Sequence, residues 1–251
     1  MSDLFSLAGR TAMVTGANTG LGQAMAVALA EAGADIVAVG RSAAADTEGL
    51  VRAAGRAFHF VQADLGQPNI SGDVIAAAKA VAAAPDILVN NAGIIRRNDA
   101  LDFTEEDWDA VMDVNLKTAF FLSQAAAREM VVKGAGKVIN IASMLSFQGG
   151  VRVASYAASK SGIAGLTRLL ANEWAVKGIN VNAIAPGYFS TNNTTALRAD
   201  EARNKSILER IPAGRWGEPS DLGGAAVFLA SAASNYVHGA ILPVDGGWLA
   251  R

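Results

Sequence analysis

The stretch "TAMVTGANTGLGQAMAVALAEAG" (residues 11–33) joins an apolar strand pattern, a glycine-rich turn and an apolar-periodic helix pattern. Its glycines Gly16, Gly20 and Gly22 are spaced G-x-x-x-G-x-G, which differs from the common G-x-G-x-x-G fingerprint. Glycines in such a turn allow the backbone to approach an anion closely at the N-terminus of the following helix. The stretch therefore predicts a strand, an anion-binding turn and a helix in direct succession.

The same alternation of strand and helix patterns continues along the whole chain. Apolar runs at 35–39, 57–61, 86–90, 137–142, 179–184 and 240–244 predict further strands, and most are separated by alanine-rich helical patterns. Strands that are apolar throughout indicate a sheet covered on both faces, and repeated strand–helix–strand units indicate parallel strands. We expect an α/β fold with one doubly wound, mostly parallel, seven-stranded sheet, and one domain over residues 1–251.

The longest segment without strand character is about 186–220. Long loops in compact domains are usually functional, and this one follows a strand end, where open α/β sheets bind ligands. We interpret it as a substrate lid with one or two short helices. A plain surface excursion is the alternative.

Composition excludes several classes of protein. The chain has 251 residues, a net charge of −2, no cysteine and two histidines, His59 and His238, that are far apart. A protein with this net charge lacks the excess of basic residues that binds nucleic acid or an anionic membrane, and we expect neither as a partner. We also expect no metal site. The first ten residues lack the basic and apolar regions of a secretory signal, which favours a cytoplasmic location.

The segment "SYAASKSG" (155–162) holds the first candidate for chemistry. Tyr156 and Lys160 are four residues apart, so a helix places them on one face. A nearby ammonium favours phenolate, and the pair could exchange a proton with an alcohol–ketone couple. Ser143, at the end of a strand pattern, could hold the substrate oxygen. Asn115, by contrast, lies in a helical pattern where an asparagine is most often a surface or cap residue.

Arg41 directly follows the second strand pattern, where the ribose of a dinucleotide would lie. An acidic residue there would bind a free 2′-hydroxyl, and an arginine would pair with a 2′-phosphate. The acid is missing at Gly40, so Arg41 favours NADP over NAD, with an ordinary surface arginine as the alternative.

The chain as a whole resembles the short-chain dehydrogenase/reductase family. The resemblance rests on "TGANTGLG" (15–22), "NNAG" (90–93), Asn115, Ser143, Tyr156 with Lys160, "PG" (186–187) and "DGG" (245–247). It implies a Rossmann-type fold, an NAD(P) cofactor and, commonly, a homotetramer.

The resemblance also implies roles for individual residues. Tyr156 would be the general acid or base, Lys160 would hold the nicotinamide ribose, Ser143 would position the reacting oxygen, and Asn115 would anchor a water-linked proton relay. The residues that would contact the cofactor are Gly16, Asn18, Thr19, Gly20, Leu21, Gly22, Arg41, Asp64, Leu65, Asn91, Ala92, Gly93, Tyr156, Lys160, Pro186, Gly187 and Thr191.

Further segments, including "NAGIIRR" (91–97) and "RIPAGRWGEPSDL" (210–222), resemble bacterial dehydrogenases of sugar acids of the gluconate and 2-dehydro-3-deoxygluconate type. A sugar acid needs a cation for its carboxylate. The candidate substrate residues are Arg96, Ser143, Gln148, Arg152 and Tyr188, with Arg97 beside Arg96. Alternatives are surface ion pairs for these arginines, a 3-ketoacyl-thioester reductase, and a regulator that senses nucleotides without turnover.

Overall fold

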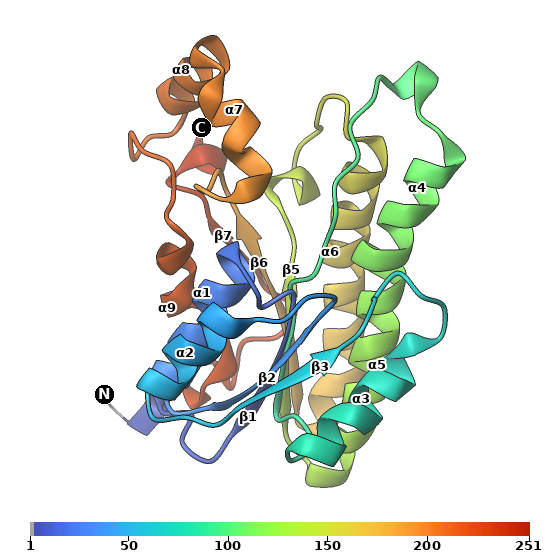
Figure 1. Ribbon diagram of the computed structural model, residues 1–251, viewed down its shortest axis with the longest axis vertical. Coiled ribbons are helices and arrows are strands. Elements are labelled where there is room, and N and C mark those ends of the chain that lie inside the picture. The colour runs from blue at the N-terminus through green and yellow to red at the C-terminus, as the bar shows by residue number, and fades with distance from the viewer. Residues whose placement is uncertain (1–2) are drawn as a thin grey trace.

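Seven parallel strands form one sheet in the order β3-β2-β1-β4-β5-β6-β7 in the computed structural model, which describes residues 3–251 (Figure 1). The strands are β1 (Thr11–Thr15), β2 (Asp35–Gly40), β3 (Phe58–Gln62), β4 (Ile87–Asn90), β5 (Gly136–Ile141), β6 (Ile179–Pro186) and β7 (Ile241–Val244). Each apolar run predicts one strand, and the expected doubly wound fold is confirmed. Every strand pair is parallel, whereas the sequence predicted only a mostly parallel sheet.

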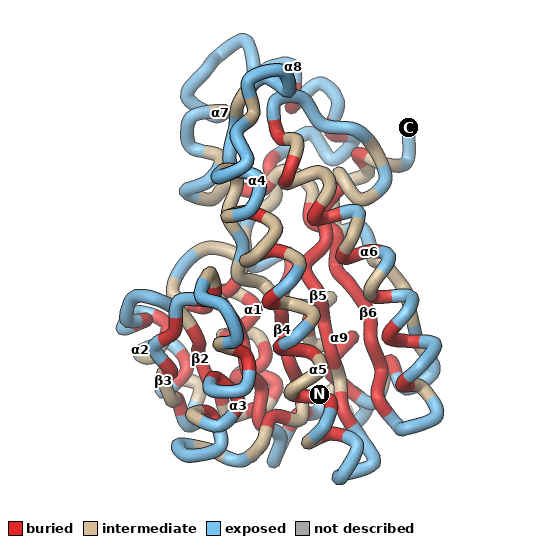
Figure 2. The backbone as a smooth tube through the Cα atoms, turned by 90° about the vertical axis from the view of Figure 1, so that its right-hand side faces the viewer, coloured by how far each residue is buried: buried red, intermediate tan, exposed pale blue. Residues whose placement is uncertain are grey.

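Helices cover both faces of this sheet. On one face lie α1 (Gly20–Glu31), α2 (Ala45–Ala53) and α9 (Gly223–Ala230), and on the other lie α3 (Ile70–Val81), α5 (Ala119–Lys133) and α6 (Ala154–Trp174) (Figure 1). The central strands are buried along their whole length in Figure 2. This double cover explains why they are apolar at every position instead of at alternate ones.

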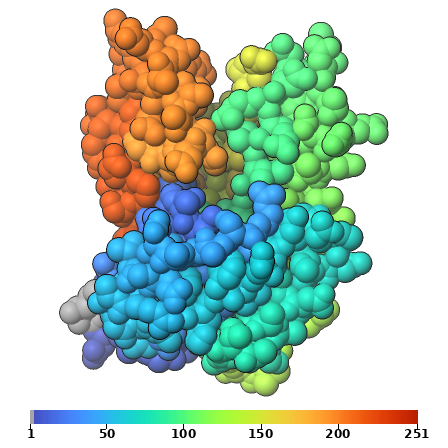
Figure 3. Space-filling model, viewed as in Figure 1, coloured from blue at the N-terminus to red at the C-terminus, as the bar shows by residue number. Residues whose placement is uncertain are grey.

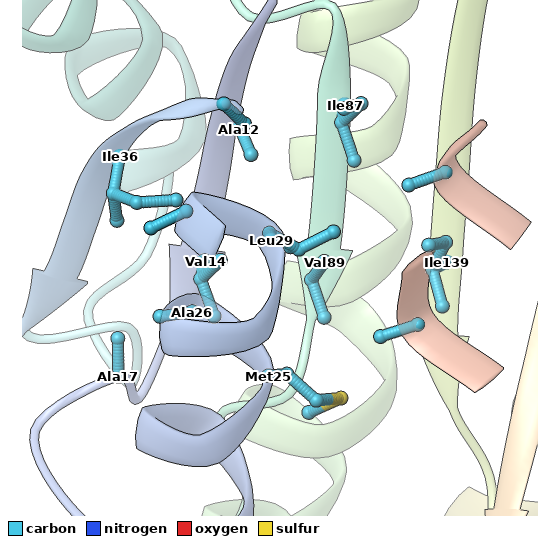
Figure 4. Packing of buried hydrophobic residues seen from close by; sticks show 14 of the residues in the cluster. Ala12, Val14, Ala17, Met25, Ala26, Leu29, Ile36, Ile87, Val89 and Ile139 are labelled. Atoms are coloured by element: carbon cyan, nitrogen blue, oxygen red, sulfur yellow. The ribbon is translucent and has the colours of Figure 1, made fainter. Parts of the chain in front are cut away.

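Successive strand residues contribute to two separate cores. Ala12 and Val14 of β1 pack with Met25 and Leu29 of α1, as Figure 4 shows. Met13, between them, points to the opposite face and packs among residues of α3, α5 and α6. The period-two geometry of a strand thus gives each helix layer its own apolar surface.

The strand order reverses direction at β1. The chain runs from β1 outward to β2 and β3, and β4 then pairs with the free side of β1. In open α/β sheets, ligands bind at the carboxyl ends of the strands beside such a switch point. The loops after β1 and β4 are therefore the expected ligand-binding edge.

The predicted lid segment, 186–220, begins at the last residue of β6 and carries α7 (Thr195–Ala199) and α8 (Glu201–Arg210). These helices stand above the carboxyl ends of β5, β6 and β7 (Figure 1). A small apolar cluster fixes them: Ile207 and Ile211 pack with Met144, Trp216 and Trp248. Both tryptophans are buried in this cluster.

One helix is irregular. The segment α4 (Glu105–Met112) continues into α5 through a π-helical stretch at Asp113–Thr118. Such π-bulges are rare and frequently occur at functional sites. Between residues 3 and 251, no helix is long and apolar enough to cross a membrane.

Candidate active site

The glycine-rich turn leaves an open helix N-terminus at the carboxyl end of β1. Gly16 and Gly20 have φ of 64° and 57°, a conformation that favours glycine. Thr19 caps α1 in an extended conformation, without a side-chain hydrogen bond to the helix. An added Cβ at Gly22 would collide with the carbonyl oxygen of Gly16 and the amide of Asn91. The helix N-terminus and the missing side chains fit the pyrophosphate of a dinucleotide.

The loops after β1 and β4 are locked together by Thr15, a residue that the sequence did not single out. The Thr15 hydroxyl accepts hydrogen bonds from the backbone N–H of Asn91 (3.0 Å) and Ala92 (2.9 Å). The Asn91 amide donates back to the carbonyls of Thr15 (2.9 Å) and Gly16 (3.1 Å). The sequence feature that could have indicated a role for Thr15 is its position, because it is a polar residue at the end of an otherwise apolar strand.

Other predicted cofactor residues lie around this edge. Thr191, at the start of the lid, lies against the glycine turn, because an added Cβ at Gly20 would be 3.7 Å from its Cγ2. Arg41 is exposed after β2, and its neighbour Ser42 accepts a hydrogen bond from Asn18 (3.0 Å). Leu65 is buried. Its carbonyl accepts a hydrogen bond from Thr118 of the π-helical stretch (2.8 Å).

Asn115 is buried inside the π-helical stretch, not on the surface. Its Oδ1 accepts from the Ile94 N–H (2.8 Å), and its Nδ2 donates to the Ile94 carbonyl (2.9 Å) and to the Ser159 hydroxyl (3.3 Å). Both amide protons are thereby used. The side chain thus links the loop after β4 to α6. The expectation that an asparagine in this helical pattern lies at the surface is wrong for Asn115.

Tyr156 and Lys160 share one face of α6, as the spacing predicts. Lys160 is buried, and its Nζ donates to the Ile141 carbonyl and lies 5.6 Å from the centre of the Tyr156 ring. Burial lowers the pKa of Lys160 to about 8. Gly162 lets α6 approach the π-helical stretch, because an added Cβ there would lie 2.9 Å from Leu116.

Ser143 is held beside the Tyr156 phenol by a tight turn. Its hydroxyl accepts the Leu145 N–H (3.2 Å), and Ser146 anchors the turn to α6 through the Lys160 carbonyl (2.6 Å). Burial raises the pKa of Tyr156, whereas a hydrogen bond with Ser143 and the charge of Arg97 each lower that pKa. The positive charge of Arg97, which the sequence named only as the neighbour of Arg96, thus favours the phenolate form of Tyr156.

The three arginine candidates differ in their surroundings. Arg96 pairs with Asp107 (3.0 Å), and Arg152 pairs with Asp99 (3.1 Å), all with substantially exposed side chains. Arg97, next to Arg96, has no ion-pair partner among residues 3–251, and its charge lowers the pKa of the Tyr156 phenol. Sequence spacing gave no reason to prefer Arg97 over Arg96, because both follow the same strand.

The lid side of the site is built on Tyr188. Its ring contacts Trp216 and Trp248 edge-on, with ring centres 5.4 Å and 4.8 Å apart. Gln148 lies after the Ser143 turn and bonds to Trp248 and Arg210. Figure 3 shows the surface hollowed between the orange lid and the green segment before and within α4. In the described part of the chain, no cluster of three or more His, Asp or Glu residues could hold a metal ion.

The fold and this edge of the sheet define a class of nucleotide-dependent oxidoreductases, and the comparison with known sequences agrees. The model of a family described as "Enoyl-(Acyl carrier protein) reductase" matches residues 16–249. The chain belongs to the short-chain dehydrogenase/reductase family.

Particular relatives are close over their whole length. The chain is 61% identical to 2-dehydro-3-deoxy-D-gluconate 5-dehydrogenase of Dickeya dadantii, over 98% of each chain. A solved structure of a gluconate 5-dehydrogenase from Burkholderia cenocepacia, in complex with NADP and tartrate, has a TM-score of 0.95 and 43% identity, and the match covers 99% of this chain and 98% of that one. An Agrobacterium tumefaciens structure with bound NADP has a TM-score of 0.95 and 63% identity over 100% of both chains.

Proposed function

We propose that the protein transfers a hydride between NAD(P) and a secondary alcohol or ketone of a sugar acid, of the gluconate or 2-dehydro-3-deoxygluconate type. The observation that carries this proposal is the unpaired charge of Arg97. Its guanidinium has no ion-pair partner among residues 3–251, and its charge lowers the pKa of the Tyr156 phenol. A free cation at the reacting end of a site favours an anionic substrate. The names of the relatives from Dickeya and Burkholderia point the same way.

In this proposal Tyr156 donates a proton from its hydroxyl to the ketone oxygen, and takes the proton back in the reverse direction. The Ser143 hydroxyl holds the same oxygen. Arg97 stabilises the negative charge that develops there, and Lys160 supports the phenol and holds the cofactor ribose. Asn115 keeps the loop that carries Arg97 in place through Ile94.

The cofactor site is proposed on the glycine turn, the loop after β4 and the start of the lid. NAD(P), when bound, supplies the hydride acceptor or donor. The chain would hold it through Gly16, Gly20 and Gly22 on the pyrophosphate and Thr191 beside them. Arg41 would pair with a 2′-phosphate, which favours NADP. Asp64 and Leu65 would border the adenine, with Asn91, Ala92, Gly93, Pro186 and Gly187 along the rest of the cofactor.

The lid at 186–220 is proposed to cover the substrate as part of a single domain. We also propose that the protein works in the cytoplasm as a homotetramer. The position of the long segment directly after β6 supports the lid, and the family resemblance supports the homotetramer.

A substrate screen tests the function. Gluconate, 2-dehydro-3-deoxygluconate and related acids would be supplied with each cofactor, and the absorbance of the reduced nicotinamide would be followed. We expect turnover of at least one sugar acid, which the Tyr156→Phe variant should lose. Turnover confined to a 3-ketoacyl thioester, or no turnover with any of these compounds, would contradict the proposal.

Two neighbouring arginines provide a matched test of the charge argument. Arg97→Gln should lower kcat/KM for the sugar acid by about 1.5–3 kcal/mol of transition-state stabilisation, the range of a hydrogen bond to a charged group. Arg96→Gln should change it far less, because Arg96 is paired with Asp107. Equal effects of the two substitutions would remove the reason for preferring Arg97.

A further inference from the structure

Gln148 connects three segments that are distant in the sequence. It lies in the loop after Ser143, and its Oε1 accepts one hydrogen bond from Nη2 of Arg210 (3.2 Å) and one from Nε1 of Trp248 (3.3 Å). Arg210 is the last residue of the lid helix α8, and Trp248 belongs to the C-terminal segment. The loop after Ser143, the lid helix α8 and the C-terminal segment therefore meet at one amide oxygen.

These two partners determine which way the amide of Gln148 faces. A guanidinium and an indole N–H can only donate hydrogen bonds, so the atom between them must be the oxygen. The Nε2 group is thereby turned away from both partners. Neither of its two protons has a hydrogen-bond acceptor among residues 3–251. A flipped amide would place donors against donors and lose both bonds.

Hydrogen-bond donors and a positive charge surround the amide of Gln148. The Arg210 guanidinium stacks on the Trp248 ring, 4.0 Å from its centre, and Arg210 has no ion-pair partner in the described part of the chain. Trp248 is buried and packs with Met144, the residue after Ser143. Stacking leaves Arg210 most of its five N–H groups free. A carboxylate, which only accepts hydrogen bonds when ionised, matches such a donor set.

The two ends of a sugar acid need separate recognition. Its carboxylate is several carbon–carbon bonds from the carbon that would react at Tyr156, where the charge of Arg97 already lowers the pKa of the phenol. Gln148 follows Ser143 in the same loop, and its partner Arg210 ends the lid helix α8.

We propose that the amide N–H groups of Gln148 bind the substrate's carboxylate, and that Arg210 and Trp248 are positioning residues that fix the orientation of this amide. The proposal rests on the sugar-acid function proposed above and deepens it. Arg210 and Trp248 act through Gln148, so the position of the lid helix and of the C-terminal segment determines how well the site recognises an acid.

The Gln148→Glu substitution separates recognition from a purely structural role. A carboxylate at this position still accepts from Arg210 and Trp248, and its charge strengthens the contact with Arg210. Its outward atom, however, becomes an acceptor that repels the substrate's carboxylate. We expect KM for the acid to rise roughly 10- to 100-fold, with kcat and the KM for the cofactor close to wild type. A KM equal to the wild-type value would show that Gln148 only joins the lid to the C-terminus, and would overturn the proposal.

Arg210 variants test the positioning role. Arg210→Met keeps an apolar contact with Trp248 but removes the donor, so KM should rise as Gln148 loses its fixed orientation. Arg210→Lys should restore part of the affinity, because an ammonium can both donate to Gln148 and lie over the ring. Arg203→Gln, on the same exposed helix, is the matched control and should leave KM unchanged. Equal KM values for Arg210→Met and Arg203→Gln would refute the positioning role.

The wild-type enzyme distinguishes the two proposals. If it oxidises or reduces a sugar acid while Gln148→Glu keeps its KM, the subsite is wrong and the function stands. If the wild type acts on no sugar acid, both the function and the carboxylate subsite fail.

Discussion

Replacing Asn115 with alanine should destabilise the protein as well as slow it. The Asn115 side chain makes three hydrogen bonds, at 2.8 and 2.9 Å to the backbone of Ile94 and at 3.3 Å to Ser159. Because Asn115 is only 2% exposed, water cannot easily take over the hydrogen bonds that the alanine variant would lose. At about 1 kcal/mol for each backbone bond and less for the long one, the free energy of unfolding should fall by about 2–3 kcal/mol.

Urea unfolding of wild type and variant at one protein concentration measures this loss. Ser159→Ala is the matched comparison, because it removes only the longest of the three bonds along with the bond from Ser159 to the Tyr156 carbonyl (2.8 Å). The double variant should lose less than the sum of the single losses, since the two residues share a bond. If Asn115→Ala lowers kcat but changes the unfolding free energy by less than about 0.5 kcal/mol, the stabilising link is refuted and a role in the proton relay alone remains.

Two further predictions concern the cofactor. Arg41→Ala should weaken NADP binding roughly 10- to 100-fold and NAD binding much less, measured by titration of each cofactor, and an equal loss for both would exclude a 2′-phosphate role. The pKa of Lys160, lowered to about 8 by burial, should rise when the anionic cofactor binds, so cofactor affinity should fall as the pH increases from about 8 to 10. Lys137→Gln is the control, because burial and the charge of Arg10 also lower the pKa of Lys137 to about 8. A dissociation constant that does not change over this range, or one that loses its pH dependence in Lys137→Gln, would contradict the assignment to Lys160.

The pattern of the sequence predicted the strands well because parallel, doubly covered strands are apolar at every position. The strand β1 was predicted with its observed bounds, and the others differ by one or two residues at their ends. The predicted end of β6 was the least accurate, since Ala185 and Pro186 continue the pairing with β7 up to the residue that opens the lid segment. A proline is unexpected in a strand, but here it lies at the last position.

The site was predicted only in part. Tyr156 and Lys160 could be paired because helical spacing relates residues one turn apart. Asn115 could not be distinguished from a surface asparagine by its residue type. Its partners, Ile94 and Ser159, are 21 and 44 residues away in the chain. The family resemblance, not the local pattern, drew attention to Asn115.

By itself, the sequence of this protein determined the local elements, the glycine turn and the Tyr156–Lys160 pair, because these depend on backbone propensity and on spacing within one helix or strand. The tertiary structure decided which of two adjacent arginines is held in an ion pair, and which donors share the oxygen of Gln148. Asp107 neutralises Arg96, while Arg210 and Trp248 reach Gln148 from 62 and 100 residues away. Such pairings depend on how the loops of different strands meet at one edge of the sheet, and no local pattern records them.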